Sequence, residues 1–262
     1  MMEAKVKKLE ERIKSLSSAV ISFSGGVDSA VLTFVAHKVL DKDMVAVTGD
    51  SFSVPSRDLN SAISFCKGRN IPHVIVKTDE FKDETYRSNP ENRCFYCKSA
   101  LFDCLQKIAV EKTFKYIVEG TNASELTGHR PGHMASKSRT NVVTPFVDLG
   151  FSKEDVREIA RYLNLEVADK PSTACLSSRI PIGTKIEPEI LRRIDNAENF
   201  LIDLGIKQVR VRHTGDTARV ESDDVGMKIC LEKRDEIVDR LASFGWKNVT
   251  LDLKGYRTGG GM

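Results

Sequence analysis

A glycine-containing turn between an apolar run and a helical pattern constrains this chain more than any other feature. The turn is Ser24-Gly25-Gly26-Val27-Asp28-Ser29, with the apolar run at 19–23 and the helical pattern at 30–36. Paired glycines let the backbone pass close to an oxyanion. The first amides of the helix have no partner inside it, and the helix dipole favours negative charge there. The pattern predicts a phosphate-binding loop to which Ser24 and Ser29 add hydroxyl donors.

Asp28 is the unexpected member of this loop, because a carboxylate repels phosphates unless a cation lies between them. We interpret Asp28 as a contact to Mg²⁺, either direct or through water. The loop is not a Walker A motif, since no Gly-Lys-Ser/Thr follows, and it is not a G-x-G-x-x-G turn. A plain strand–turn–helix connection is the alternative, which the two serines and the aspartate at phosphate-facing positions disfavour.

The first part of the chain alternates strand and helix patterns. Strands are predicted at 19–23, 44–48, 72–76 and 116–118, and helices at 3–16, 55–67, 94–109 and from Ser152 as N-cap to 163. This alternation indicates an α/β fold with a parallel sheet and helices on both faces. Ligands of such sheets lie beyond the carboxyl ends of the strands, where the phosphate loop falls.

The remainder of the chain predicts a smaller α+β unit. It contains predicted helices over 187–203 and 224–243 and predicted strands over 208–212, 218–221 and 248–253. With 262 residues the chain is long enough for two domains. We expect domains at 1–175 and 176–262.

Composition limits the classes of partner. Forty Lys+Arg against 37 Asp+Glu give a net charge of +3, which is too balanced to favour nucleic acid as a partner. The charged N-terminal segment is not typical of a signal peptide, and no apolar run reaches the length of a membrane span. We therefore expect a cytoplasmic protein, in which the six cysteines are thiols, cluster ligands or reactive groups rather than disulfides.

Three of the six cysteines lie in sequence contexts that suggest a functional role. Cys94 and Cys97 form a C-x-x-C at the start of a predicted helix, and alone this pair fits a redox site, half a zinc site or part of an iron–sulfur site. Cys175 stands alone between Pro171 and Pro181. The other three, Cys66, Cys104 and Cys230, lie in helical patterns near apolar faces and are predicted to be core residues.

The segment around Cys175 carries a specific resemblance. Pro171-Ser172-Thr173-Ala174-Cys175-Leu176-Ser177-Ser178-Arg179-Ile180-Pro181-Ile182-Gly183-Thr184 resembles the signature of the LarE-type sulfur transferases. These are PP-loop enzymes of the ATP pyrophosphatase superfamily that act in nickel-pincer nucleotide biosynthesis. The resemblance spans nearly the whole chain and includes the loop at 24–29, Glu119-Gly120-Thr121-Asn122, Arg130-Pro131-Gly132, Arg210-Val211-Arg212 and Gly255-Tyr256-Arg257-Thr258-Gly259.

The resemblance implies an activity and its cofactors. ATP with Mg²⁺ adenylates a ring carboxylate of pyridinium-3,5-dicarboxylate mononucleotide, and sulfur displaces AMP to give a thiocarboxylate. The loop residues together with Gly120, Thr121 and Asn122 would bind the nucleotide. Family members assemble into hexamers, so a homo-oligomer is expected.

The source of the sulfur has two alternatives within the family. In the three-cysteine branch, Cys94, Cys97 and Cys175 would hold a [4Fe-4S] cluster whose open iron binds a hydrosulfide taken from sulfide or another donor. In single-cysteine members, the thiolate corresponding to Cys175 attacks the adenylate and its Cβ–S bond then breaks, which leaves dehydroalanine. The C-x-x-C favours the cluster, with sacrificial transfer from Cys175 as the alternative.

Other candidate site residues follow from the same resemblance. Arg210 and Arg212 alternate with valines, so both face one side of a strand. A solvated face is the usual interpretation of such a pair, but here the arginines match the family's phosphate-binding positions. Further candidate substrate contacts are Ser178, Arg179, Glu198 and Glu221; for the two glutamates, metal binding and simple salt bridges both stay open. The histidines at 129, 133 and 213 fit no compact metal site and are predicted to be exposed loop residues.

Three other functions remain as rivals. Some PP-loop proteins with three-cysteine clusters thiolate tRNA, which the near-neutral charge disfavours here. An amide-forming synthetase that uses ammonia would leave Cys94, Cys97 and Cys175 without a role. A carrier of sulfur or iron–sulfur groups could bind nucleotide without catalysis, and it would release no pyrophosphate.

Overall fold

The computed structural model describes residues 2–127, 134–136, 139–171 and 173–257. The chain forms two compact units, each assembled from several segments. Unit 1 comprises Met1–Ser51, Asp58–Glu80 and Asn92–Thr173. Unit 2 comprises Phe52–Arg57, Phe81–Glu91 and Ala174–Met262.

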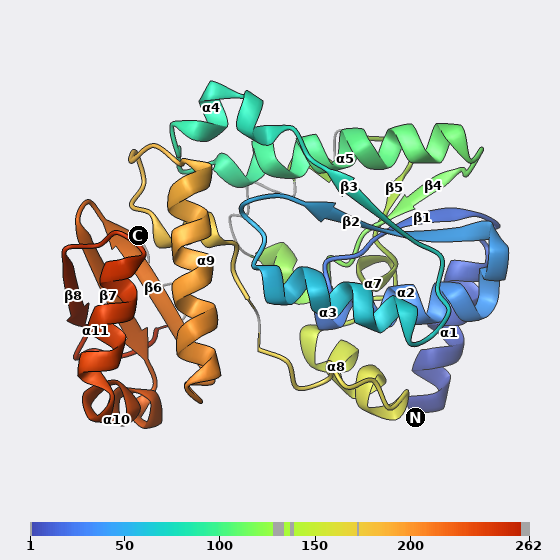
Figure 1. Cartoon of the computed structure of the whole chain (residues 1–262). Coiled ribbons are helices and arrows are strands. Elements are labelled where there is room, and N and C mark those ends of the chain that lie inside the picture. Colours follow the sequence, from blue (N-terminus) through green and yellow to red (C-terminus); the bar gives the residue numbers. More distant parts are fainter. Residues whose placement is uncertain (1, 128–133, 137–138, 172, 258–262) are drawn as a thin grey trace. The chain divides into compact units, whose positions relative to one another are not determined.

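Five parallel strands form the sheet of unit 1, in the order β3-β2-β1-β4-β5 (Figure 1). The strands are β1 (Ala19–Ser22), β2 (Met44–Asp50), β3 (His73–Lys77), β4 (Tyr116–Val118) and β5 (Val142–Val143). The predicted parallel α/β sheet is thereby confirmed. Because β1 pairs with both β2 and β4, the strand order reverses beside β1. Ligands of open parallel sheets bind at this reversal, beyond the carboxyl ends of the strands.

Helices cover both faces of this sheet. They are α1 (Met2–Lys14), α2 (Val27–Leu40), α3 (Ser56–Lys67), α5 (Arg93–Glu111), α7 (Pro145–Asp148) and α8 (Lys153–Tyr162), with short 3-10 turns η1 (Asp41–Asp43), η2 (Glu80–Lys82) and η3 (Ala123–Thr127). Alternate strand residues point to opposite faces, so Ile21 packs with α1, α2 and α8, whereas Val20 packs with Phe102 and Leu105 of α5.

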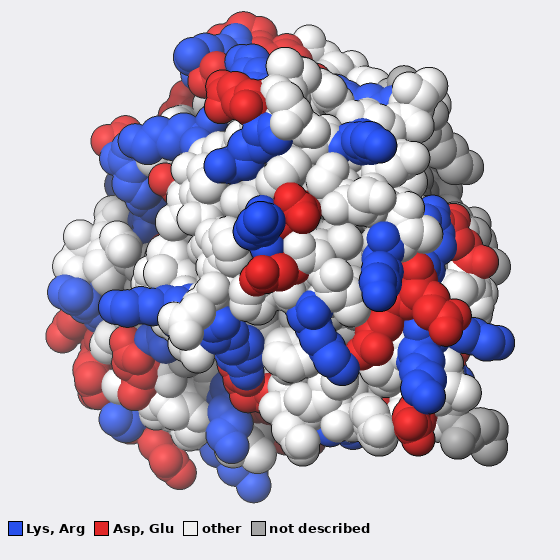
Figure 2. All heavy atoms as spheres, turned by 90° about the vertical axis from the view of Figure 1, so that its right-hand side faces the viewer, with Lys and Arg blue, Asp and Glu red and all other residues white. Residues whose placement is uncertain are grey.

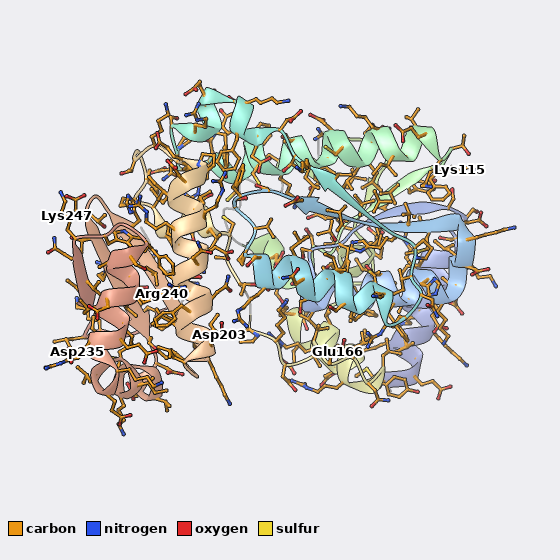
Figure 3. All side chains as sticks on the ribbon, viewed as in Figure 1. Lys115, Glu166, Asp203, Asp235, Arg240 and Lys247 are labelled. Atoms are coloured by element: carbon orange, nitrogen blue, oxygen red, sulfur yellow. The ribbon has the colours of Figure 1, made fainter. Side chains whose placement is uncertain are left out.

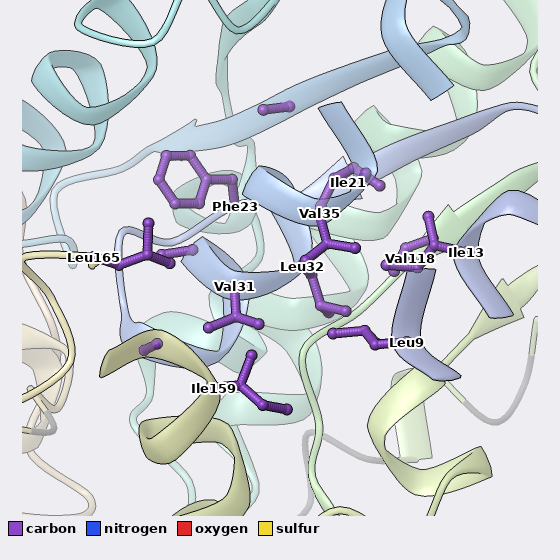
Figure 4. Packing of buried hydrophobic residues seen from close by; sticks show 14 of the residues in the cluster. Leu9, Ile13, Ile21, Phe23, Val31, Leu32, Val35, Val118, Ile159 and Leu165 are labelled. Atoms are coloured by element: carbon purple, nitrogen blue, oxygen red, sulfur yellow. The ribbon is translucent and has the colours of Figure 1, made fainter. Parts of the chain in front are cut away.

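The larger core surrounds α2 (Figure 4). Val31, Leu32 and Val35 of this helix are fully buried, and they share one cluster with Leu9 of α1 and Ile159 of α8. A helix that is apolar around most of its circumference must be covered on several sides. The sheet and two helices supply that cover, which fixes the position of the α2 N-terminus and of the loop that precedes it.

The start of α8 follows its predicted cap. The Ser152 side chain accepts a hydrogen bond from the Asp155 backbone, and the Asp155 carboxylate accepts one from the Ser152 backbone over 2.8 Å. This reciprocal capping box satisfies two amide groups that the helix itself leaves without partners.

Unit 2 is built on a three-stranded sheet in the order β6-β7-β8. Its strands are β6 (Val209–Thr214), β7 (Thr217–Ser222) and β8 (Asn248–Leu251), with β6 and β7 antiparallel and β7 and β8 parallel. Its helices are α4 (Glu84–Arg87), α9 (Pro188–Asp203), α10 (Asp224–Glu232) and α11 (Arg234–Ser243), with the 3-10 turn η4 (Leu176–Arg179).

The single helix predicted over 224–243 is wrong, because α10 and α11 are separate helices that meet at Lys233. The Lys233 backbone, with φ −106° and ψ 24°, departs from helical geometry. Periodicity could not reveal this break. The buried residues Gly226, Cys230, Ile237 and Leu241 keep a helix-compatible spacing across it.

Charged side chains cover the outside of both units. The six that Figure 3 labels, Lys115, Glu166, Asp203, Asp235, Arg240 and Lys247, are all exposed. Within the described part of the chain, no helix combines the length and the apolar character that crossing a membrane requires.

Candidate active site

The predicted phosphate loop connects β1 to α2 with the expected backbone geometry. Gly25 has φ +74°, a left-handed conformation that side chains rarely adopt, and an added Cβ would lie 3.3 Å from the Ala62 Cβ. The Ser29 hydroxyl donates to the Gly26 carbonyl over 3.1 Å and accepts from the Ser24 amide over 3.2 Å. Gly26 is the N-cap and has no side chain to occupy the first amides of α2. The loop can therefore present these amides to an anion.

Asp28 lies in the first turn of α2 and is held by two other segments. Its Oδ1 accepts a hydrogen bond from Asn122 Nδ2 over 3.1 Å, and its Oδ2 forms an ion pair with Lys153 at the start of α8. Gly120 lies against the same turn, since an added Cβ would be 3.2 Å from the Asp28 Cβ and the Ser29 amide. The segment that follows β4 is thereby placed at the phosphate loop.

The oxygen atoms around Asp28 suit a hard divalent cation. Mg²⁺ prefers carboxylate and carbonyl oxygens, often with water between. Asp28 supplies a carboxylate, and Asn122 supplies a buried Oδ1 that has no hydrogen-bond partner among the described residues. Asp28 and Asn122 could therefore hold Mg²⁺ beside bound phosphates.

The C-x-x-C pair lies in the first turn of α5. Cys94 is exposed and Cys97 is half-buried, and residues three positions apart share one face of a helix. The next residue, Lys98, forms an ion pair with the largely buried Glu119 that follows β4. Glu119 also accepts a hydrogen bond from the Thr121 hydroxyl over 2.8 Å. The cysteine-bearing turn is thus connected to the segment that contacts Asp28.

Cys175 belongs to unit 2, where it precedes η4 beside a buried arginine. Arg179 donates to the carbonyls of Ala174 and Cys175 over 2.7 and 3.1 Å and to the Ser178 hydroxyl over 3.0 Å. Its other two nitrogens bind both carboxylate oxygens of Glu198 at 2.9 Å. Burial by itself lowers the pKa of Arg179, but the Glu198 charge outweighs it and raises the pKa above its usual value. The guanidinium therefore stays charged and fixes the backbone of the Cys175 turn.

Two further arginines of β6 lie in the same unit. Arg212 Nε donates to Glu221 over 2.6 Å and Nη1 donates to the Ser178 carbonyl over 2.9 Å. Arg210 stacks on the Tyr256 ring at 4.5 Å. Burial, together with the charges of Arg179 and Arg212, lowers the pKa of Arg210, although Tyr256 opposes this effect. Three arginines near one another against two glutamates leave an excess of positive charge.

This arginine cluster has unused hydrogen-bonding capacity. Within the described residues, Arg212 Nη2 is buried and has no hydrogen-bond partner. A buried donor without a partner is costly unless a ligand satisfies it. The cluster, defined as Arg179, Arg210 and Arg212, is therefore suited to an anionic group.

The chain resembles known proteins over most of its length. Residues 1–185 match the family described as NAD synthase, and this match includes the phosphate loop and its parallel sheet. The chain is 30% identical over 250 residues to the pyridinium-3,5-bisthiocarboxylic acid mononucleotide synthase of Lactiplantibacillus plantarum. The aligned region covers 94% of this chain and 90% of the synthase. This chain belongs to the LarE-type group of the PP-loop family. As a member of this group it is an ATP-dependent sulfurtransferase.

The LarE-type chain is also similar to proteins with other names. An uncharacterized protein of Synechocystis sp. is 39% identical over 261 residues, which covers 99% of this chain and 97% of that protein. A component of the glutamine-hydrolyzing GMP synthase of Archaeoglobus fulgidus is 24% identical over 211 residues, 76% of this chain and 69% of its own length. The predicted family, fold class and enzyme class of this chain are confirmed.

The structure brings the predicted site residues together in two groups. In unit 1, Asp28 and Asn122 are hydrogen-bonded, and Gly120 packs on the loop residues. In unit 2 the group comprises Ser178, Arg179, Glu198, Arg210, Arg212 and Glu221 around the Cys175 turn. The solvated-face alternative for Arg210 and Arg212 is wrong, because both side chains are buried. Glu198 and Glu221 form the salt bridges that were one of their two alternatives.

The predicted three-cysteine cluster of the LarE-type chain stays a prediction. Cys94 and Cys97 belong to unit 1 and Cys175 to unit 2, and no group of three metal-ligating side chains occurs among the described residues. Cys66 and Cys230 are buried as predicted, and burial raises the pKa of the Cys66 thiol to about 12. Cys104 is half-buried.

The prediction that His213 is an exposed loop residue is wrong. β6 extends to Thr214, so His213 is a buried strand residue, and its Nδ1 accepts a hydrogen bond from Trp246 over 3.0 Å. Several motif residues lie outside the described part of the chain, namely His129, His133, 130–132 and 258–259.

Three lysines at the phosphate loop were not predicted. Lys153 pairs with Asp28, Lys98 pairs with Glu119, and Lys170 donates to the Gly25 carbonyl over 3.2 Å while pairing with Asp58. None belongs to a motif with a known spacing in the sequence. Lys98 and Lys153 lie near the starts of predicted helices, Lys170 lies outside every predicted element, and no sequence pattern relates them to the loop.

Proposed function

We propose that this enzyme converts a carboxylate of pyridinium-3,5-dicarboxylate mononucleotide into a thiocarboxylate. A carboxylate oxygen attacks the α-phosphorus of ATP, which forms an acyl adenylate and releases pyrophosphate. A hydrosulfide then attacks the acyl carbon, and AMP leaves with the electron pair of the broken C–O bond. The substrate follows from the relative whose name gives the corresponding bisthiocarboxylic acid mononucleotide as its product.

The first half of this reaction is supported by unit 1. The uncapped amides at the start of α2 and the hydroxyls of Ser24 and Ser29 can stabilise departing pyrophosphate. Mg²⁺ held by Asp28 would neutralise the phosphates when bound. Gly120 packs against the same turn, and we assign it and the neighbouring Thr121 to the nucleotide.

The observation that carries the proposed substrate is the arginine cluster around the Cys175 turn. Arg210 and Arg212 provide guanidinium groups that suit a phosphate, and Arg212 Nη2 is a buried donor with no partner in the described residues. Arg179 holds the Cys175 backbone in the same cluster. Cys175 and a group of arginines suited to the phosphate of a mononucleotide thus lie in one unit.

We further propose that Cys94, Cys97 and Cys175 hold a [4Fe-4S] cluster. The donor set supports this role, since the exposed Cys94 and the half-buried Cys97 lie one helical turn apart. When bound, an iron without a protein ligand would supply a replaceable hydrosulfide, so the chain would not be consumed. Sacrificial transfer from Cys175 is the competing route. We also expect a homo-oligomer.

The proposed substrate is a small mononucleotide rather than a nucleic acid. On the face drawn in Figure 2, basic and acidic side chains are interspersed and do not gather into one basic surface. Binding to phosphate backbones depends on clustered positive charge.

The function is tested by measuring pyrophosphate release and thiocarboxylate formation together. Wild-type protein with ATP, Mg²⁺, sulfide and the dicarboxylate mononucleotide should give both products, and Asp28→Ala should give neither. Pyrophosphate release that does not depend on the mononucleotide would contradict the proposed substrate. The absence of any release would favour a nucleotide-binding carrier.

The sulfur source is tested separately on anaerobically purified protein. Iron and acid-labile sulfide near four per chain are expected for a [4Fe-4S] cluster, with loss of both in Cys97→Ala. Cys104→Ala is the matched control, because this thiol lies on the same helix outside the C-x-x-C. Negligible iron, with loss of the Cys175 sulfur after turnover by mass spectrometry, would establish the sacrificial route instead.

A further inference from the structure

Lys153 occupies a position that helix stability does not explain. It is the first residue of α8, where the helix dipole disfavours a cation. The same turn already has its capping box and two acidic residues, Glu154 and Asp155, that suit the helix N-terminus. The Lys153 ammonium instead forms an ion pair with Asp28, a residue of the phosphate loop.

Asp28 is engaged on both of its carboxylate oxygens. Asn122 donates to Oδ1 and Lys153 contacts Oδ2, so two separate segments converge on one carboxylate. The Asp28 side chain is only 19% exposed and that of Lys153 only 30%. Removing one partner of a partly buried ion pair leaves the other charge without compensation. Asp28 therefore needs a neighbouring cation whether or not nucleotide is bound.

The proposed function places Mg²⁺ beside this same carboxylate. A hydrated Mg²⁺ and a lysine ammonium at the same oxygen repel each other and compete for one lone-pair direction. Lysine has a flexible four-carbon stem, so its ammonium can leave the oxygen without any movement of α8. The ion pair with Oδ2 is thus replaceable.

We propose that Lys153 is the resident counter-cation of the phosphate loop. The Lys153 ammonium neutralises Asp28 while the loop is empty. When Mg²⁺·ATP binds, the ammonium leaves Asp28 Oδ2 and offsets the charge of the incoming phosphates instead. This role rests on the proposed function only in that ATP binds at this loop. It does not depend on the carboxylate substrate or on the sulfur source.

This role of Lys153 has two consequences for nucleotide binding, and both can be measured without an activity assay. Since Lys153 competes with Mg²⁺, its removal should lower the Mg²⁺ concentration that gives half-maximal binding of nucleotide. Since Lys153 also screens Asp28 from phosphates, its removal should weaken the binding of nucleotide without metal. The two effects have opposite signs, which general damage to the site would not produce.

The test is calorimetric titration of α,β-methylene-ATP in EDTA and at a series of Mg²⁺ concentrations. In Lys153→Met, the half-saturating Mg²⁺ concentration should fall by about threefold to tenfold, and the affinity in EDTA should fall by a similar factor, as expected for a partly exposed ion pair. Lys153→Gln is the second variant, for use if the methionine variant does not fold. In an Asp28→Asn background, Lys153→Met should have no further effect on the Mg²⁺ midpoint.

Lys5→Met is the matched control. Lys5 also forms a lysine–aspartate pair with α8, through Asp155, with side-chain exposures of 29% and 24%, but it does not contact Asp28. This variant should leave both binding constants unchanged. The role is overturned if Lys153→Met binds the analogue with an unchanged or higher Mg²⁺ midpoint, or if Lys5→Met reproduces the shift. If wild-type protein does not bind the analogue at all, the proposed function fails as well.

Discussion

The Arg179 guanidinium and the Glu198 carboxylate meet through two hydrogen bonds, Nε to Oε1 and Nη2 to Oε2, each 2.9 Å long and both buried. Glu198 Oε1 also accepts the Val211 amide of β6 over 2.9 Å. One carboxylate therefore connects α9, β6 and the turn that carries Cys175. This relationship makes the position of Cys175 depend on a residue that need not touch substrate.

Glu198→Gln should destabilise the protein severely, because it leaves a buried guanidinium without its counter-charge. A loss of about 3 kcal/mol is expected for breaking a buried pair, measured by urea unfolding. Glu84→Gln is the control, since its pair with Arg87 is exposed and should contribute less than about 1 kcal/mol. Equal losses in the two variants would contradict a buried structural pair.

Acidification should weaken unit 2 through His213. Burial, assisted by the Arg193 charge and opposed by Asp216, lowers the pKa of His213 from its usual 6.5. As pH falls, the unfolded chain takes up this proton before the folded chain does. The stabilising contribution is thus present above pH about 6.5 and is lost below it.

This pH effect can be checked by melting temperatures between about pH 8 and about pH 5. His213→Gln should reduce the slope below pH about 6.5 and not abolish it, because burial also lowers the pKa of His73. An unchanged slope in the variant would show that protonation of His213 does not limit stability.

Arg210→Lys should weaken binding of the mononucleotide substrate without affecting ATP. The guanidinium lies 4.5 Å above the Tyr256 ring, and lysine would lose both this stacking and two-point phosphate contact. A rise of about tenfold in substrate KM is expected, with the KM for ATP unchanged. Arg240→Lys, which removes an exposed arginine stacked on Phe244, is the control and should change neither constant. A parallel rise in both KM values would show that Arg210 supports the structure in general and does not bind the substrate specifically.

Gly226→Ala should destabilise the protein although alanine is the better helix former. An added Cβ would lie 1.9 Å from the Ser222 Oγ and 2.5 Å from the Ile206 Cγ2. This overlap should cost about 1–3 kcal/mol, whereas helix propensity alone predicts a gain of about 1 kcal/mol. The sign of the change in unfolding free energy shows whether steric overlap or helix propensity dominates. Val225→Ala, at an exposed neighbouring position, should have little effect.

Local features of the fold were predictable from the sequence, whereas long-range pairings were not. The loop at 24–29 and the cap at Ser152 depend on a few adjacent residues, so their residue types indicate the structure directly. Lys153 and Asp28 are 125 residues apart, and no periodicity relates them. Their pairing depends on where β1, α2 and α8 meet, which only the packed sheet determines.

The candidate site shows the same division. Alternation predicted that Arg210 and Arg212 share one side of a strand, but it could not predict that this side is buried against Glu221 and the Cys175 turn. A polar strand face looks solvated in sequence whenever its counter-charges come from other elements. The segments 52–57 and 81–91 likewise carried no sign that they belong to unit 2.

The discontinuity of unit 2 has a consequence for synthesis on the ribosome. Arg57 hydrogen-bonds to Asn199, and the Arg87 carbonyl accepts the Ile186 amide, so early segments of unit 2 bind partners that are translated much later. All segments of unit 1, including α8, are translated by Thr173, so a nascent chain can form its phosphate loop before the later partners of those early segments are made. The nucleotide-binding half of the enzyme is therefore assembled before the arginine cluster exists. A prematurely terminated chain would keep the first half and lack the second.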